Sequence, residues 1–371
     1  MIVEICRKKG SEPRNVIKKL KGMIILIAQE ISFTPRMEKL EAFLRRVPTS
    51  DSKWYEALAE LKRRLAGYRG EKSLDFHLSM LPDSEYLIFH GLRLLLGKYY
   101  FQIDILILCA KFALAMEVKN MSGELSFEKK LNQVIWKRNG TEERIQSPVQ
   151  QARLQARKLK IWLLKHNCPD IPIHYMFVNS NEKTIIRIET GNEQILRYIC
   201  NSENLIDRIE EKANYYQEDK LDSKEIKKIK RLLLANNTPD NPDILKAYNK
   251  TSQDIPTGVQ CPNCNAIPIV YKNGKWHCQR CKAVSKTAHI PAINDYFLLI
   301  KQTITTRELC QFLHIGSINI GYKIMKSLNL SYTGNFRNRV YYQPKKALGP
   351  PLQLSWIYHL DIVYTKEKAS M

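Results

Sequence analysis

The chain has 371 residues, of which 44% are hydrophobic and 26% charged, a composition typical of folded domains and unlike that of a disordered chain. Lysine and arginine outnumber aspartate and glutamate by 59 to 37, and the resulting net charge of +22 indicates a polyanionic partner, nucleic acid first. The longest apolar run near the N-terminus, residues 23–28, is too short for a membrane span or for a secretory signal. We therefore expect no membrane association and no targeting segment.

Cysteine usage indicates the redox compartment, and the pattern of apolar residues near the N-terminus bears on the translation start. Nine cysteines are present, four of them in two Cys-x-x-Cys pairs and the rest scattered. This distribution favours a reducing compartment and one metal site over a disulfide framework, so we expect a cytoplasmic protein. A regular periodicity of apolar residues begins only near Pro35, which makes Met23 an alternative translation start to Met1.

The periodicity of apolar residues predicts an α/β multidomain chain. In chain order we expect a basic helical N-terminal extension (1–64), a mixed α/β domain (65–199), a charged helical segment with a linker (200–258), a ribbon (259–290), a helical module with a predicted wing (291–345) and a tail (346–371).

Two apolar segments on either side of Ala110–Lys111 predict a buried β-hairpin with a two-residue turn. In that register Asp104 lies directly opposite Glu117, with Cβ atoms about 4.5–5.5 Å apart. Facing carboxylates repel unless a cation holds them, so a divalent metal explains the pair. Lys119 shares the face of Glu117, and its ammonium group is placed to orient a water nucleophile or to stabilise charge at phosphorus.

Two predicted helices aim polar side chains at the same place. Glu71 shares a helical face with Leu74 and Leu78, so it points inward. Ser147–Pro148 predicts the N-cap and first turn of another helix, along which Gln151 continues the apolar face. Each of these groups taken singly is more often an ordinary surface or helix-start residue, whereas their joint order favours a shared site.

Motifs in this region resemble those of the nuclease-related (NERD) domain, a branch of the PD-(D/E)XK restriction-endonuclease-like fold. They are Arg69-Gly70-Glu71-Lys72, Gln102-Ile103-Asp104, Glu117-Val118-Lys119-Asn120 with Ser122-Gly123, and Pro148-Val149-Gln150-Gln151-Ala152. The resemblance covers about residues 65–185. It implies a restriction-endonuclease-like α/β core and hydrolysis of phosphodiester bonds with Mg²⁺ or Mn²⁺. It further implies Asp104 and Glu117 as metal ligands, with Lys119, Glu71 and Gln151 as further catalytic-site residues.

Two cysteine pairs predict a zinc ribbon. Cys261 and Cys264 form the first pair, Cys278 and Cys281 form the second, and Asn273-Gly274 between them is a strong hairpin signal. Four thiolates complete a closed tetrahedral site for one structural Zn²⁺. The alternatives are unligated thiols or a redox pair, and the ribbon is suited equally to nucleic acid and to protein.

A helix-turn-helix pattern follows the ribbon. Thr305 and Glu308 match a capping box that opens the first helix, Ser317 begins the second, and residues 331–342 predict a wing that turns at Gly334-Asn335. The side chains predicted to contact DNA are Asn319, Lys323, Lys326, Arg337 and Arg339. A short helical pair with a hairpin is also a common protein-docking unit.

We therefore expect a metal-dependent endonuclease acting on DNA, targeted by the zinc ribbon and the helix-turn-helix. The alternative is a catalytically silent DNA-binding or regulatory protein that uses the nuclease fold as a platform. RNA is an alternative substrate, because a phosphate-directed site does not read the sugar. The sequence indicates neither the cleavage specificity, nor the oligomeric state, nor the pathway.

Overall fold

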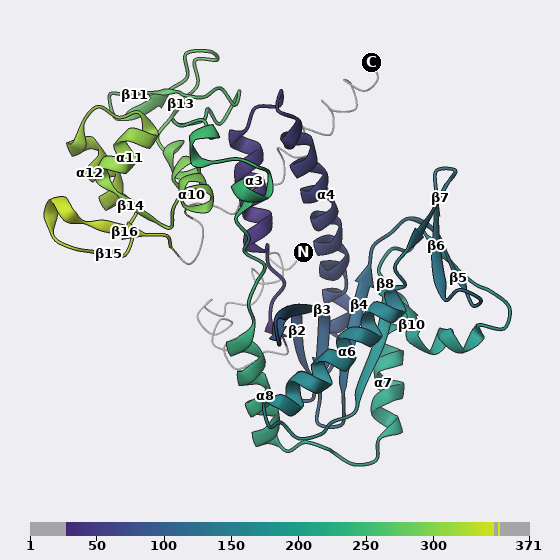
Figure 1. Cartoon of the computed structure of the whole chain (residues 1–371). Coiled ribbons are helices and arrows are strands. Elements are labelled where there is room, and N and C mark those ends of the chain that lie inside the picture. Colours follow the sequence, from purple (N-terminus) through teal and green to yellow (C-terminus); the bar gives the residue numbers. More distant parts are fainter. Residues whose placement is uncertain (1–26, 345–347, 349–371) are drawn as a thin grey trace, which may run out of the picture. The chain divides into compact units, whose positions relative to one another are not determined.

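The computed structural model describes residues 27–344 and Leu348 (Figure 1). Predictions for residues 1–26, including the choice of start, and for the tail apart from Leu348 lie outside the described residues. The chain divides into two compact units. Among the described residues, unit 1 contains 27–34 and Lys62–Asp240, and unit 2 contains Pro35–Leu61, 241–344 and Leu348. The boundary falls within helix α4 (Ser52–Ser73).

Unit 1 is built on a 6-stranded sheet with the order β1-β2-β3-β4-β8-β10. Its strands are β1 (Ile27–Gln29), β2 (Leu87–Leu96), β3 (Tyr99–Leu108), β4 (Ala113–Lys119), β8 (Ile173–Asn179) and β10 (Ile199–Asn201). Strands β2, β3 and β4 pair antiparallel, whereas β8 runs parallel to β4. The predicted mixed α/β fold is confirmed.

Helices cover both faces of this sheet, which explains why β3 and β4 are apolar on both sides. One face packs against α6 (Pro148–Lys165) and α8 (Ser223–Asn236), and the other against α5 (Asp75–Leu78) and α7 (Leu205–Tyr215). Helix α6 begins as the sequence predicts, because the Ser147 side chain accepts a hydrogen bond from the backbone N–H of Gln150. Small residues of α6, Ala152 and Ala156, are buried against the sheet.

A smaller 4-stranded sheet, ordered β7-β6-β5-β9, lies beside the β8–β10 edge of the main sheet (Figure 1). Its strands are β5 (Gly123–Glu128), β6 (Gln133–Arg138), β7 (Thr141–Ile145) and β9 (Thr184–Ile188). Its apolar side, with Leu125, Phe127 and Val134, packs against Phe177 of β8 and Ile199 of β10. Short 3₁₀ helices η2 (Glu193–Tyr198) and η3 (Ser202–Asn204) flank β10.

Unit 2 contains two 3-stranded sheets and several helices. In chain order its elements are α3 (Pro35–Arg46), the first part of α4, α9 (Ile244–Ala247), η4 (Ser252–Asp254), β11 (Val270–Lys272), β12 (Lys275–His277), β13 (Val284–Ser285), α10 (His289–Leu299), β14 (Thr303–Thr305), α11 (Thr306–Leu313), α12 (Ile318–Ser327), β15 (Tyr332–Thr333), η5 (Phe336–Asn338) and β16 (Val340–Tyr342).

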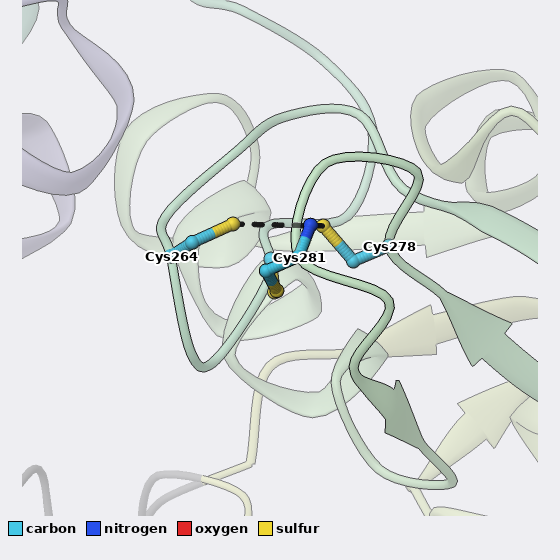
Figure 2. Close-up of side chains that lie close together, drawn as sticks. Cys264, Cys278 and Cys281 are labelled. Carbon is cyan, nitrogen blue, oxygen red and sulfur yellow. Dashed lines mark hydrogen bonds between the residues drawn. The ribbon is translucent and has the colours of Figure 1, made fainter.

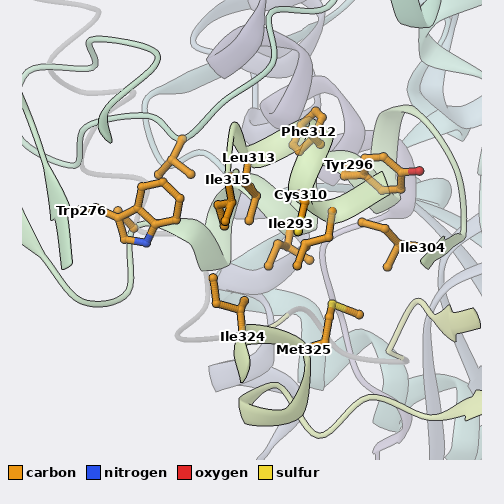
Figure 3. Close-up of a cluster of buried hydrophobic side chains, with 14 of the residues drawn as sticks. Trp276, Ile293, Tyr296, Ile304, Cys310, Phe312, Leu313, Ile315, Ile324 and Met325 are labelled. Atoms are coloured by element: carbon orange, nitrogen blue, oxygen red, sulfur yellow. The ribbon is translucent and has the colours of Figure 1, made fainter. Parts of the chain in front are cut away.

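The cysteine-bearing segment and the helices after it share one hydrophobic core. Figure 3 shows Trp276 of β12 in the same cluster as Phe312 of α11 and Met325 of α12. Two of the cysteines, Cys261 and Cys278, are buried members of this cluster. The ribbon and the helix-turn-helix are therefore parts of one packed body.

Part of the stretch that composition predicts as a linker also packs in unit 2. Helix α9 buries Ile244, and Tyr248 follows it with its ring centre 5.1 Å from that of Phe43 in α3. These apolar side chains hold the segment against α3, although its Asn, Asp and Pro content is typical of a connector.

A buried ion network joins α3 to α10 within unit 2. Asp295 is 2% exposed and accepts hydrogen bonds from Arg45 Nη2 at 2.6 Å and Arg46 Nε at 2.8 Å. Arg46 also donates to the carbonyl oxygen of Gly258 at 2.7 Å. Two guanidinium groups thus satisfy one buried carboxylate, the condition under which a buried charge is tolerated.

No helix in the described part of the chain combines the length and the apolar character that crossing a membrane requires.

Candidate active site

The candidate site lies where β3 and β4 separate. Their pairing runs from Leu108–Ala113 to Ile105–Met116 in the register predicted from the sequence, but it ends before the predicted Asp104–Glu117 pair, which is not formed. Beyond that point β4 continues alongside β8 as far as the pair Lys119–Asn179. The Asp104 side chain turns into the fork, where its Oδ2 accepts a hydrogen bond from the backbone N–H of Val118 at 2.9 Å. A carboxylate thus takes the place of a backbone acceptor at the end of the ladder.

A local irregularity in β2 and β3 accompanies this fork. The pairs His90–Ile105 and Leu92–Ile103 flank Gly91, which has a φ of +58°. Ile105 packs into the core on the α5 side, whereas Ile103 packs into the core on the α6 side. Strand alternation therefore breaks at Asp104, and glycine at position 91 permits the backbone conformation that the break requires.

Glu117 and Lys119 project together from the end of β4. Glu117 is only 8% exposed, and its Oε1 accepts a hydrogen bond from Lys119 Nζ at 2.6 Å. Burial alone would lower the pKa of Lys119, but the carboxylates of Glu117 and Asp104 outweigh it and raise this pKa above its usual value. The lysine is therefore a fixed cation beside two carboxylates.

Glu71 reaches this cluster because Gly70 lets the last turn of α4 approach very closely. A Cβ atom at Gly70 would lie 2.6 Å from Cβ of Asn120 and 2.9 Å from Oγ of Ser180. These residues follow β4 and β8 directly. Burial, together with the charges of Asp104 and Glu117, raises the pKa of Glu71 to about 9.

The pKa of Asp104 is also raised, to about 7, by burial and by the charge of Glu117. Three carboxyl groups therefore act on one another electrostatically in this part of unit 1, and together they favour either protonation or a bound cation.

Gln151 lies in the first turns of α6, and its Nε2 donates a hydrogen bond to Gln146 Oε1 at 2.8 Å. Its own Oε1 is buried and has no hydrogen-bond partner in the structure, and the same holds for Oε1 of Gln155 one turn later. Buried acceptors of this kind ordinarily have a donor such as water. The first turns of α6 thus contain two buried amide oxygens that lack a donor.

Two further polar residues lie near Glu71 and were not among the predicted site residues. His90 is 2% exposed, its Nε2 lies 3.4 Å from Asp75 Oδ1, and Asp75 Oδ2 accepts a hydrogen bond from Lys72 Nζ at 2.6 Å. The charge of Asp75 contributes to the raised pKa of Glu71. A histidine inside the apolar strand Leu87–Leu96 was the available sequence signal.

The donor set at the fork suits a hard divalent cation, which prefers oxygen ligands such as carboxylates. The buried Glu117 and the half-buried Asp104 supply such oxygens. The carboxyl groups are nevertheless less convergent than the ligands of a closed site. Among the described residues, only the four cysteines bring the metal-binding atoms of three or more side chains within 4.8 Å of one another.

Those four cysteines, Cys261, Cys264, Cys278 and Cys281, form a cluster that can bind a metal such as zinc. The Sγ atoms of Cys261 and Cys281 are 3.6 Å apart, and those of Cys264 and Cys278 are 3.5 Å apart. Figure 2 shows Cys264 facing Cys278 with Cys281 beside them. Four sulfur atoms fill a tetrahedral sphere without leaving a position for substrate.

The fold of this segment brings the two cysteine pairs together. Asn273 and Gly274 have φ values of +53° and +77°, which suit the two-residue turn predicted between β11 and β12. Asn265 and Lys282, each directly after a cysteine pair, also have positive φ.

Helices and strands occupy the region in which the sequence predicts a helix-turn-helix and a wing. Thr305 and Glu308 form the capping box of α11, and His314 ends that helix in the left-handed conformation. Ser317 stands at the N-cap position of α12, although its side chain makes no capping hydrogen bond. Strands β15 and β16 pair antiparallel, as expected for a wing.

The side chains predicted to contact DNA differ in their surroundings. Asn319, Lys323 and Lys326 are exposed on α12, and Arg337 is exposed between β15 and β16. Arg339 is only partly exposed. Its guanidinium carbon lies 4.5 Å from the ring centre of Tyr332, and its Nη1 donates to the hydroxyl of Tyr322 at 3.5 Å.

The raised pKa of Asp104 predicts a stability gain on neutralising this residue. Above a pH of about 7 the parent must carry the charge within the carboxyl cluster, whereas the Asp104→Asn variant need not. In chelator at pH 8.5 we expect unit 1 of the variant to melt about 4 °C or more above the parent, a difference that shrinks towards pH 5. Differential scanning calorimetry measures it. Exposed Glu85→Gln is the control, and a lower melting temperature for Asp104→Asn at pH 8.5 would contradict the prediction.

Comparison with protein families supports the resemblance noted in the sequence. Residues 66–180 match the family model of the nuclease-related domain. The matched region contains all the residues of the candidate site, namely Glu71, Asp104, Glu117, Lys119 and Gln151. No curated protein and no solved structure matches the chain. The chain therefore carries a nuclease-related (NERD) domain at residues 66–180.

Proposed function

We propose that unit 1 hydrolyses phosphodiester bonds of DNA with Mg²⁺ or Mn²⁺, as an endonuclease of the PD-(D/E)XK type. The observation that carries this proposal is the placement of Asp104, Glu117 and Lys119 together at the fork between β3 and β4. The metal, when bound by Asp104 and Glu117, would supply Lewis-acid stabilisation of charge on the phosphate.

Side chains of the protein would supply the other groups that act on the phosphate and on the attacking water. Lys119, held by Glu117 at 2.6 Å, provides a cation for the charge that develops on the phosphate oxygens or for orienting the attacking water. Glu71, whose pKa is raised by burial and by the charges of Asp104 and Glu117, would offer a further oxygen to bind that water. The buried amide oxygen of Gln151, which has no hydrogen-bond partner in the structure, is proposed to serve in the same way.

Unit 2 supports a role in DNA targeting through its charge. From Leu309 to Leu360 the sequence contains no aspartate or glutamate, while the exposed α12 and wing carry Lys323, Lys326 and Arg337. A segment that carries cations and no acidic residue favours a polyanion. The cysteine cluster, as a structural zinc site, would hold the core from which α12 and the wing project.

A second candidate function is a catalytically silent DNA-binding or regulatory protein. The carboxyl groups of unit 1 converge less closely than the cysteines do, and this observation favours it. RNA as substrate is the other alternative, since no contact at the fork is specific to deoxyribose. Parallel assays with DNA and RNA of one sequence separate the two substrates.

Cleavage assays test the catalytic proposal directly. With Mg²⁺ or Mn²⁺ we expect the parent to cut plasmid DNA, and Asp104→Ala and Lys119→Ala each to lower the rate at least about 100-fold. Lys98→Ala, an exposed lysine in the turn between β2 and β3, is the charge-matched control and retains activity. Equal cutting by all four proteins would refute the site, and absence of cutting by any would favour the silent alternative.

DNA binding in chelator tests the targeting proposal separately. We expect Lys323→Ala, Lys326→Ala and Arg337→Ala each to weaken binding and to reduce the salt slope of log K by about 0.9 for each phosphate that is no longer neutralised. Arg339 is left unchanged because it packs between Tyr322 and Tyr332. Fluorescence anisotropy measures the slope, and slopes equal to that of the parent would exclude α12 and the wing from the DNA interface.

Metal analysis tests the zinc assignment. The reduced protein is expected to contain one zinc per chain, and Cys264→Ser to lose it. Because Cys261 and Cys278 belong to the core of unit 2, loss of the metal should also lower the melting temperature of that unit. The variant Cys310→Ser, at a buried cysteine that is not one of the four in the predicted zinc site, should retain zinc. Full zinc content in Cys264→Ser would contradict the assignment.

A further inference from the structure

We infer that the β6–β7 hairpin of unit 1 holds an unpaired nucleobase of the substrate strand within about three nucleotides of the scissile phosphate. This rests on the proposed function, because it names the form in which the same site takes its nucleic acid. The geometry that points to it is a pocket built on one face of the hairpin.

The pocket has a volume of about 400 Å³ and is lined by Trp136, Arg138, Asn139, Thr141 and Glu143. Trp136 pairs with Glu143 and Arg138 pairs with Thr141, so these side chains share one face of the hairpin. Its volume lies within the range of about 300–1,000 Å³ typical of small-ligand pockets.

Trp136 is placed as a stacking surface. The other tryptophans in the described part of the chain, Trp54, Trp162 and Trp276, are at most 4% exposed, whereas Trp136 is partly open to solvent. Its Nε1 donates a hydrogen bond to the carbonyl oxygen of Ser122 at 2.9 Å, which fixes the ring. The guanidinium carbon of Arg138 lies 5.8 Å from the ring centre. An indole with a cation beside it suits the π-face of any base.

The remaining lining residues suit the edge of a base. Arg138 and Asn139 offer donors and Glu143 offers an acceptor, the groups that pair with base edges. On the opposite face Lys137 and Glu142 bind each other at 2.8 Å, whereas neither Arg138 nor Glu143 has an ion-pair partner among the described residues. The pocket face therefore keeps its polar groups available.

The hairpin is fixed close to the catalytic cluster. Ser122, the acceptor for Trp136, is three residues beyond Lys119, so their Cα atoms are at most about 11 Å apart. Gly123 has a φ of +104°, and a Cβ there would lie 2.3 Å from the carbonyl oxygen of Lys137, which shows how tightly β5 and β6 pack. About three stacked nucleotides span that distance, at about 3.4 Å each.

A base in a duplex is stacked on both sides and paired at its edge, so it cannot enter such a pocket. A base that is already unpaired can enter at little cost in unstacking, whereas a paired base must first be unstacked and flipped out of the helix. The pocket therefore favours single-stranded DNA or a strand with unpaired bases near the cut over intact duplex.

Tryptophan fluorescence of the full-length protein in chelator tests the stacking. A single-stranded DNA oligonucleotide should quench part of the emission excited at long wavelength, and Trp136→Phe should abolish that part. The same oligonucleotide with abasic sites, and a matched duplex, should not produce it. Quenching that persists in Trp136→Phe, or that is equal with the abasic strand, would overturn the inference.

Affinity measurements by anisotropy provide a second test. Trp136→Leu should weaken binding of the single strand about fivefold or more while Trp136→Phe retains most of it, and neither should change binding of the abasic strand. If Trp136→Leu does not fold, Arg138→Ala against the exposed Lys130→Ala gives the comparison at matched charge. Equal losses of affinity in Arg138→Ala and Lys130→Ala would overturn the inference. So would a loss of affinity that is as large for the abasic strand as for the strand with bases.

These outcomes are distinguishable from failure of the proposed function. A protein that cuts no DNA can still show the base-dependent quenching, and then only catalysis fails. A protein that cuts DNA at a rate dependent on Asp104 but shows no base-dependent quenching retains its activity and loses the base pocket.

Discussion

The candidate site depends on the point at which β3 leaves β4. In a continuous ladder the backbone N–H of Val118 would find a backbone acceptor, and the side chain of Asp104 would remain on the face of the sheet. Here the strands part after Ile105–Met116, and the Asp104 carboxylate accepts that N–H instead. The fork therefore orients one carboxylate with a main-chain hydrogen bond and leaves Glu117 and Lys119 on the strand that continues beside β8.

Part of this arrangement could be predicted because it depends on local sequence. The two-residue turn sets the register of the β3–β4 hairpin, so the pairing up to Ile105–Met116 follows from counting residues, but the strands part before the predicted Asp104–Glu117 pair. Capping boxes and the spacing of the cysteine pairs are also short-range signals, and the helix start at Ser147 and the cysteine cluster appear where they indicate.

What could not be predicted depends on contacts between distant segments. The break of alternation at Asp104 involves Gly91 on a neighbouring strand, and a lone glycine in an apolar strand does not say which residue it will displace. The Asp75–His90 contact and the common core of ribbon and helices are likewise long-range packing events. The exposure of a side chain also depends on such long-range packing. Arg337 and Arg339 look equivalent in sequence, yet of the two it is Arg339 that packs between tyrosines.

The distribution of charge suggests that DNA binding and DNA cleavage depend on different parts of the molecule. A net charge of +22 attracts a polyanion over much of the chain, but the carboxyl groups at the fork repel any phosphate that approaches them. A phosphate can therefore reach Lys119 only when a cation, or protons, offset the charges of Glu117 and Asp104. Under the proposed function, affinity for DNA should survive the loss of metal while cleavage does not, because the surfaces that would bind the backbone are cationic without it. A loss of both together would indicate that the fork itself holds the nucleic acid, an arrangement that the charges of Glu117 and Asp104 oppose.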